Sequence, residues 1–134
     1  MNYQQEWLNR KKGDKIGIVA NDDQLKAELE ELVAVMCKAL NDPKRLLILN
    51  LIAEGPRSVG ELVRLIGSPQ ANVSQHLAVL RDRGIIEASK QGTAVKYSLR
   101  YPQLLSAINI LREVMREEVR RRGDVIVSPD AAAS

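Results

Sequence analysis

The residues that could do chemistry in this chain lie along one short stretch, residues 68 to 84, which is expected to be a helix. Amide, hydroxyl and imidazole side chains line one face of it: Gln70, Asn72, Ser74, Gln75 and His76. Apolar residues recur at helical spacing on the other face: Val73, Leu77 and Leu80. Such polar groups at the N-terminal end of a helix can bond base edges in the major groove of DNA, where the helix dipole also favours phosphates. By itself, the same face could be the solvated side of an ordinary surface helix.

The boundaries of this helix and of the helix before it are marked by capping residues. Ser68 is the expected N-cap, Pro69 the first helical residue and Gly84 the stop. Before it, Ser58 and Glu61 have the spacing of a capping box for a short helix that ends at Gly67. Its inward residues are Val59, Leu62, Leu65 and Ile66. Two short helices joined by a turn of about three residues predict a helix-turn-helix.

A β-hairpin is expected after Gly84. Ile85 and Ile86 begin an extended segment to about Lys90, residues 91 to 93 form the turn, and apolar residues alternate with polar ones up to Leu99. Because Lys90 and Lys96 flank it, the hairpin would be a basic wing able to touch the DNA backbone or the minor groove.

Positive charge is concentrated around these elements. Between residues 68 and 100 there are five Lys and Arg residues against two acidic residues, an excess that equals the chain's net charge of +3. Arg81, Arg83, Lys90 and Thr93 are candidates for contacts to the DNA backbone, although a surface charge run is usually only solvated. Arg45 is expected to brace helix ends instead.

The remaining helices are strongly apolar. We expect one helix over residues 24–40, a central buried helix from Pro43, capped by Asn41 or Asp42, to Gly55, and a last helix over residues 101–122. The last helix has more apolar surface than a small monomer needs. The natural partner is a second copy, which predicts a dimer through the N- and C-terminal helices, with intrachain packing as the alternative.

Composition limits the fold to one compact domain. With 134 residues, 3% aromatic residues and no Phe, the core must use Leu, Ile, Val and Ala, which suits packed helices. The expected class is mainly α with a small β-hairpin, with an N-terminal arm (1–23), a winged helix-turn-helix domain (24–122) and a disordered tail (123–134). No apolar run approaches the ~20 residues of a membrane span, and the N-terminus lacks a secretion signal, so a cytoplasmic protein without membrane contact is expected.

Three segments together resemble the ArsR family of winged-helix transcriptional repressors, over residues 30 to 120. They are NDPKRLLILNLI, SVGELVRLIG and SPQANVSQHLAVLRDRGIIEASKQGTAVKYSL. The Asp-Pro-x-Arg start at Asp42, the Val-Ser-x-His-Leu run from Val73 and the Arg-x-x-Gly-Ile ending at Ile85 carry the likeness. It implies a homodimeric repressor on a partly palindromic operator in double-stranded DNA. His76 then matches the family's histidine and bonds a phosphate or the neighbouring helix, whereas Ala71 stands where relatives often carry Ser.

The family's sensing sites are missing from this sequence. Many relatives place a Cys-x-Cys pair where this chain has Ser58 and Gly60, and others bind metals with Asp and His on the C-terminal helices. Residues 101 to 122 contain no His, Asp or Cys, so no metal site or cofactor is expected. The carboxylates there should form ion pairs with arginines instead, such as Glu113 with Arg116 or Arg112 with Glu117.

The single cysteine, Cys37, has two interpretations. One is a small buried hydrophobe in the helix over residues 24–40. The other is a thiol sensor near the dimer interface, where oxidation would alter a packed helix. Relatives that sense sulfide or oxidants use two cysteines, so this chain departs from their pattern.

Other functional classes are less well supported. A MarR-like regulator that responds to a small organic ligand shares the winged helix, and a winged-helix module that binds protein would need an apolar or acidic recognition face. An enzyme is not expected, because there is no Gly-rich phosphate loop and the only His and Cys lie on different helices without a visible partner, so no catalytic residues are predicted.

Overall fold

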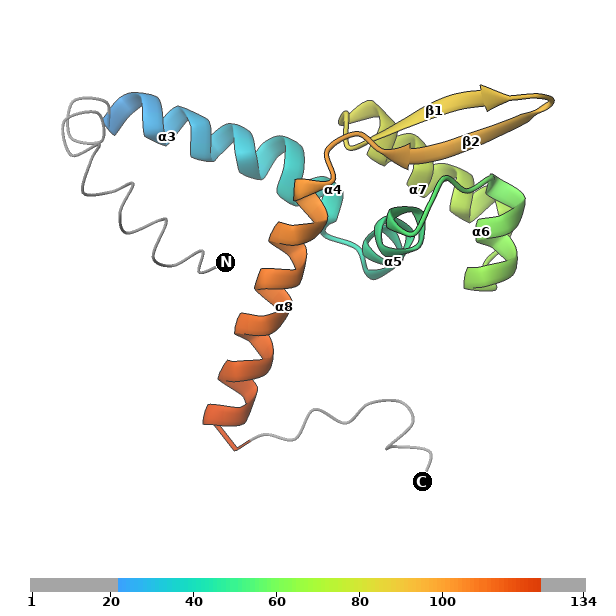
Figure 1. Cartoon of the computed structure of the whole chain (residues 1–134). Coiled ribbons are helices and arrows are strands. Elements are labelled where there is room, and N and C mark those ends of the chain that lie inside the picture. Colours follow the sequence, from blue (N-terminus) through green and yellow to red (C-terminus); the bar gives the residue numbers. More distant parts are fainter. Residues whose placement is uncertain (1–21, 124–134) are drawn as a thin grey trace. The chain divides into compact units, whose positions relative to one another are not determined.

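The computed structural model describes residues 22–123, and the chain divides into two compact units between Asn41 and Asp42. Among the described residues, the first unit holds one helical run, and the second holds four helices and a hairpin in the order α5, α6, α7, β1, β2, α8 (Figure 1). Residues 1–21 of the expected arm, and residues 124–134 of the expected tail, lie outside the described residues. The mainly α class with one small hairpin is confirmed.

The helical run of the first unit differs from the single α-helix expected over residues 24–40. It comprises α3 (Asp22–Glu31), the π-helical segment η1 (Leu32–Cys37) and α4 (Lys38–Leu40). In η1 each turn is widened by one residue, as in the bond from the Lys38 backbone N–H to the Val33 carbonyl. The residues at both ends of η1 keep right-handed helical backbone angles, so the helix continues through this segment. The spacing of apolar residues in the sequence therefore does not distinguish a π-helical segment from an α-helix.

Helix α5 (Pro43–Ala53) begins where Asp42 caps it. One carboxylate oxygen of Asp42 accepts hydrogen bonds from the backbone N–H groups of Lys44 at 2.8 Å and Arg45 at 3.2 Å. Its buried side chains are Ile48, Leu49 and Ile52. The expectation of a central buried helix is met on one face only, since Leu47 is 44% exposed. An apolar residue is thus exposed on this helix.

Helices α6 (Val59–Ile66) and α7 (Gln70–Asp82) form the expected helix-turn-helix. The capping box of Ser58 and Glu61 is present, and Gly67 ends α6 with φ of +76°, which glycine adopts without steric cost. Ser68 is not the cap of α7, contrary to expectation. Pro69 holds that position, and its ψ of 146° keeps it outside the helix, so α7 starts one residue later than predicted.

The hairpin consists of β1 (Ile86–Gln91) and β2 (Ala94–Leu99), paired antiparallel from Ile86↔Leu99 to Gln91↔Ala94. A two-residue connection joins them, in which Gly92 has φ of +66°. The hairpin packs beside α7 (Figure 1). At its base, Arg57 and Tyr97 exchange two backbone hydrogen bonds of 3.0 and 2.8 Å, which tie β2 to the loop before α6.

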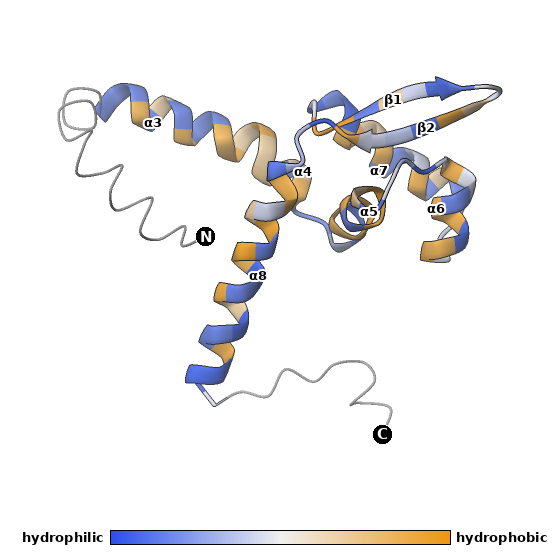
Figure 2. Cartoon of the chain, viewed as in Figure 1, coloured by the Kyte–Doolittle hydropathy of each residue, from blue (hydrophilic) through white to orange (hydrophobic). Residues whose placement is uncertain are grey.

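Helix α8 (Gln103–Arg121) closes the described chain, and Ile108 is its one buried residue. Further along, Leu111, Val114 and Met115 are exposed, and Figure 2 shows such hydrophobic residues alternating with hydrophilic ones along α8. The ion pairs expected here are wrong in detail: Arg122 pairs with Glu118, and Arg112 donates to the Asn109 side chain. Among residues 22–123 no helix has the length and apolar character needed to cross a bilayer.

One apolar core joins the helix-turn-helix to the hairpin. Helix α7 packs against α5, α6 and β1. The largest fully buried side chains come from all of these elements and from the loop before β1: Ile48, Leu49, Leu62, Val73, Leu80, Ile85 and Ile86. The position of α7 is therefore set by apolar packing on its inner face.

We predict that Leu62→Ala lowers the free energy of unfolding by about 2–5 kcal/mol, because Leu62 is completely buried and truncation leaves a cavity. Urea denaturation at fixed protein concentration measures this. Leu65→Ala, on the same helix but 52% exposed, is the matched control and should change stability by less than about 0.5 kcal/mol. Equal losses for the two variants would contradict the assignment of the core.

Candidate nucleic-acid interface

The polar face predicted for residues 70 to 76 is present on the outer side of α7. Gln70, Ser74 and Gln75 are exposed, while Val73, Leu77 and Leu80 on the opposite face are at most 2% exposed. The division into one buried and one exposed face is therefore confirmed. The exposed amides and hydroxyl lie in the first half of the helix, where a recognition helix contacts base edges.

The start of α5 lies beside the start of α7. The Lys44 ammonium donates a hydrogen bond of 3.3 Å to the side-chain oxygen of Asn72. This bond orients the Asn72 amide and leaves its NH₂ group available as a donor. Lys44 was not identified from the sequence, because nothing local to it indicates contact with a residue 28 positions away.

His76, also predicted to contact DNA, is directed toward α5. Its side chain is 14% exposed, its Nδ1 lies 3.3 Å from Nη1 of Arg45 and its Nε2 lies 3.9 Å from a carboxylate oxygen of Asp42. Arginine can only donate, so the geometry suits a neutral ring with the proton on Nε2, facing Asp42. Two contacts were expected for His76, a phosphate or the neighbouring helix, and the structure places the ring against the neighbouring helix α5. Arg45, which was expected to brace helix ends, is the residue that makes this contact.

The side chain of Asp42 caps α5 and also lies near His76 of α7. Burial raises the pKa of its carboxyl, but the backbone hydrogen bonds from Arg45 and Lys44 outweigh this effect, helped by the charge of Arg45 and, whenever its ring is protonated, that of His76. The net result is a pKa below the ordinary value. The carboxylate thus stays ionised and keeps both contacts at neutral pH.

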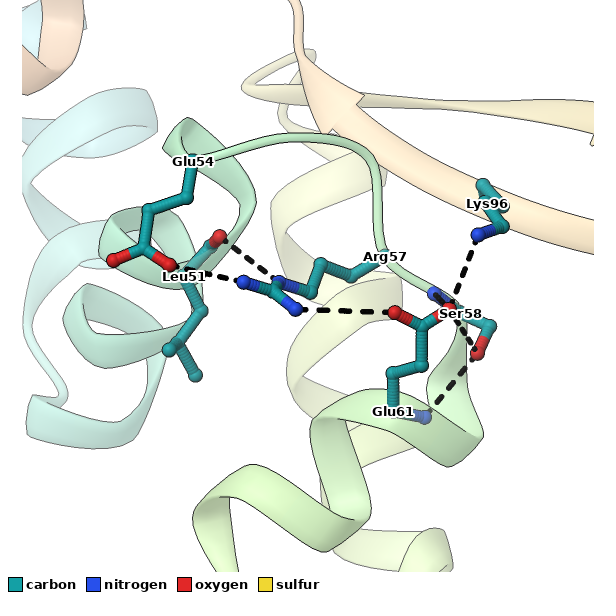
Figure 3. Close-up of polar contacts among 6 residues, drawn as sticks. All are labelled: Leu51, Glu54, Arg57, Ser58, Glu61 and Lys96. Atoms are coloured by element: carbon teal, nitrogen blue, oxygen red, sulfur yellow. Dashed lines mark hydrogen bonds and ion pairs between the residues drawn. The ribbon is translucent and has the colours of Figure 1, made fainter.

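The wing presents fewer cations than the sequence indicated. Lys90 on β1 and Thr93 in the connection are exposed, as is Arg81 at the end of α7. Lys96 was expected to act with Lys90 as a DNA contact, but its ammonium lies 3.2 Å from Oε1 of Glu61 on α6 (Figure 3). The contact of Lys96 with DNA stays a prediction, and in this structure its ammonium is paired with the carboxylate of Glu61.

Arg57 and Glu61 centre a polar network that joins the end of α5, the start of α6 and β2 (Figure 3). Arg57 donates to Glu54 at 2.9 Å and to the Leu51 carbonyl at 3.3 Å, and it lies 3.9 Å from Glu61. Arg57 lies between α5 and α6, and its partners Glu54 and Glu61 are three and four residues away, so opposite charges at short spacing in the sequence could have indicated these pairs. Glu61 and Lys96 are 35 residues apart, so no sequence pattern indicates their contact.

The environment of Glu61 stabilises its ionised form. The hydrogen bond from Lys96 is the largest influence and lowers the pKa of the carboxyl, whereas burial opposes it. The backbone and side chain of Ser58 and the charge of Lys96 lower the pKa further. Glu61 therefore remains a carboxylate throughout the neutral range.

Two kinds of sensing site were considered from the sequence, the thiol of Cys37 and a metal site. Cys37 is exposed in the single chain, so its interpretation as a buried hydrophobe is wrong here. Its role as a thiol sensor stays a prediction. Within residues 22–123, no three His, Cys, Asp or Glu side chains are grouped so that they could hold a metal ion.

Known regulatory proteins are similar to this chain in sequence. Residues 42–88, which include α5, α6, α7 and the start of β1, match the family described as bacterial regulatory protein, arsR family. The HTH-type transcriptional regulator YgaV of Escherichia coli is 38% identical over 92 residues, covering 68% of this chain and 92% of that protein. The biofilm growth-associated repressor of Xylella fastidiosa is 33% identical over 104 residues, covering 78% of this chain and 90% of that protein.

A solved structure is similar as well. It is the solution structure of the homodimeric winged helix-turn-helix DNA-binding domain of a possible ArsR-family transcriptional regulator from Mycobacterium bovis. The TM-score is 0.64 at 30% identity, covering 72% of this chain and 89% of that domain. The TM-score shows that the likeness in sequence extends to the fold.

We predict that Lys96→Gln raises the pKa of Glu61, because the ammonium that stabilises the carboxylate is removed. Carboxyl ¹³C chemical shifts followed by NMR during an acid titration report this value. Lys90→Gln, which changes an exposed lysine of the same hairpin, should leave it unchanged. Since the folded pKa is lowered, the contribution of Glu61 to stability is present at neutral pH and is lost as the pH falls through that value.

Proposed function

The chain belongs to the arsR family of bacterial regulatory proteins, and we propose that it is a homodimeric repressor that binds a partly palindromic operator through α7. Gln70, Ser74 and Gln75 carry this proposal, because they are exposed at the start of a helix whose opposite face is fixed in the core. A recognition helix needs this combination, since its side chains must meet base edges in a defined register.

Residues of the interface divide into two groups in this proposal. Amide and hydroxyl groups on α7 read bases, because Gln and Asn can bond an adenine edge with two hydrogen bonds. The base-reading group is Gln70, Asn72, Ser74 and Gln75. Cations and hydroxyls at the end of α7 and on the wing bind the backbone: Arg81, Lys90 and Thr93. His76 acts with Arg45 by holding α7 in place, as its ring faces α5.

A second copy of the chain would cover the apolar residues that remain exposed. Leu111, Val114 and Met115 on α8 are each more than half exposed, and Leu25, Leu29 and Val33 of the first unit line an open groove. The similar domain from Mycobacterium bovis is homodimeric. Two-fold symmetry would present two α7 helices to two half-sites, which explains why the operator is expected to be partly palindromic.

The signal that releases the operator would differ from a thiolate-bound metal at the start of α6. Ser58 occupies one position at which many ArsR relatives carry cysteine, and its hydroxyl accepts a hydrogen bond of 3.2 Å from the Glu61 backbone N–H. This hydroxyl supports the helix end. We therefore propose a repressor that responds to another class of signal.

Two variants separate base reading from backbone binding. Gln75→Ala should weaken binding to the promoter of the gene by about 1–3 kcal/mol and leave binding to random DNA unchanged. Lys90→Gln should weaken both by similar factors and reduce the slope of log K against log salt by about 0.9 for each lost phosphate contact. Fluorescence anisotropy over a series of salt concentrations measures both effects.

Equal affinity of the wild-type protein for promoter and random duplexes would contradict the proposed function. If Gln75→Ala weakened both duplexes equally, Gln75 would not be a base-reading residue.

Leu111→Glu is expected to dissociate the dimer at micromolar concentration, because it places a charge in the proposed apolar interface. Sedimentation velocity measures the change from dimer to monomer. Glu113→Lys changes the charge on the opposite side of the same helix and should leave the dimer intact. A monomeric wild-type protein, or a dimer that tolerates Leu111→Glu, would count against this interface.

A further inference from the structure

The two lysines of the wing are in different electrostatic situations. Lys90 is exposed on β1, whereas the Lys96 ammonium on β2 contacts Glu61 Oε1 at 3.2 Å (Figure 3). The side chains of Lys96 and Glu61 are 30% and 27% exposed. Their attraction is therefore screened less by salt than that between fully exposed charges.

The placement of β2 does not depend on this ion pair. Arg57 and Tyr97 already join β2 to the loop before α6 by two backbone hydrogen bonds of 3.0 and 2.8 Å. The hairpin ladder and the contacts of β2 with α5 add to this attachment. The ion pair is thus expected to affect the charge that the wing presents more than its position.

Neighbouring residues other than Lys96 also fix the position of the Glu61 carboxylate. Its carboxylate accepts from the backbone N–H of Ser58 at 3.5 Å and from the Ser58 hydroxyl at 3.2 Å, and Arg57 lies 3.9 Å from its other oxygen. A carboxylate fixed by a capping box loses little side-chain entropy when it pairs with a cation. A phosphate would have to compete with this preformed partner to recruit Lys96.

We propose that Glu61 limits the affinity of the protein for DNA of any sequence, because it retains Lys96 within the protein and keeps one cation of each wing off the DNA backbone. The proposal rests on the DNA-binding function inferred above. Phosphate contacts carry no sequence information but raise affinity for every sequence. A repressor that withholds one such contact binds every sequence more weakly and with a shallower salt dependence, while its ratio of operator to random binding is unchanged.

A freed Lys96 would have a phosphate within reach. In a helix-turn-helix the first helix crosses the DNA backbone, and Lys96 lies against the N-terminal turn of that helix, α6. Each added phosphate contact steepens the dependence of log K on log salt by about 0.9 on double-stranded DNA. The salt slope therefore counts the cations that contact DNA.

The test compares four full-length proteins: wild type, Glu61→Gln, Lys96→Gln and the double variant. Glutamine at position 61 keeps the capping box and removes only the charge. Affinities for the promoter fragment and for a random duplex are measured by anisotropy between about 50 and 200 mM salt. Lys90→Gln is the control for a lysine that is proposed to contact DNA in the wild-type protein.

Glu61→Gln should tighten binding to the random duplex by roughly threefold or more at the low end of the salt range and steepen the slope by about 0.9 per docked protomer. The promoter should gain by the same factor, so that the ratio of promoter to random affinity stays the same. Lys96→Gln alone should leave the slope unchanged, and adding Lys96→Gln to Glu61→Gln should restore the wild-type slope. A role of Glu61 in folding alone would not produce this reversal.

Three results would overturn the proposal. They are an unchanged slope in Glu61→Gln, a steeper slope that persists in the double variant, or a flatter slope in Lys96→Gln alone, which would mean that Lys96 already contacts phosphate. If Glu61→Gln fails to fold, Lys96→Gln alone decides between an unchanged and a flatter slope. Failure of the wild type to prefer the promoter would instead refute the DNA-reading function, so the two failures are distinguishable.

Discussion

The burial of one face of α7 is the constraint on which the rest of the second unit depends. Val73, Leu77 and Leu80 pack into a core that also contains residues of α5, α6 and β1. Because these side chains are at most 2% exposed, α7 cannot rotate about its axis without exposing apolar surface. The outward direction of Gln70, Ser74 and Gln75 therefore follows from packing on the opposite side of the helix.

Polar contacts then refine what the core has positioned. Asp42 and Arg45 at the start of α5 meet His76, and Lys44 meets Asn72, so the first half of α7 is held from one side. Arg57 attaches the wing to the loop before α6 through its backbone bonds with Tyr97, and Glu61 pairs with Lys96 of the wing. A helix-capping residue takes part in both places. Asp42, the cap of α5, lies near His76 of α7, and Ser58, the cap of α6, donates a hydrogen bond to Glu61, which pairs with Lys96 of the wing.

Local signals in the sequence predicted the helices and the hairpin, but they did not predict the contacts between residues far apart in the chain. The capping box of Ser58 and Glu61, the stop at Gly67 and the hairpin turn at Gly92 depend on residues a few positions apart, and all were predicted correctly. Contacts across 28 to 35 residues, such as those of Lys44 and Lys96, need the folded chain. The π-helical segment η1 and the late start of α7 escaped prediction because apolar periodicity and cap preference do not register a shift of one residue in backbone hydrogen bonding.

The capping role of Ser58 has a consequence for how sensing can change in proteins with this fold. The Ser58 hydroxyl accepts the Glu61 backbone N–H, and it offers a soft metal ion no thiolate. A cysteine at position 58 would gain a thiolate ligand and lose the best hydrogen-bond acceptor for the helix end. Acquiring a metal response at this position therefore means giving up helix stability until the metal is bound, which would link the folding of α6 directly to the signal.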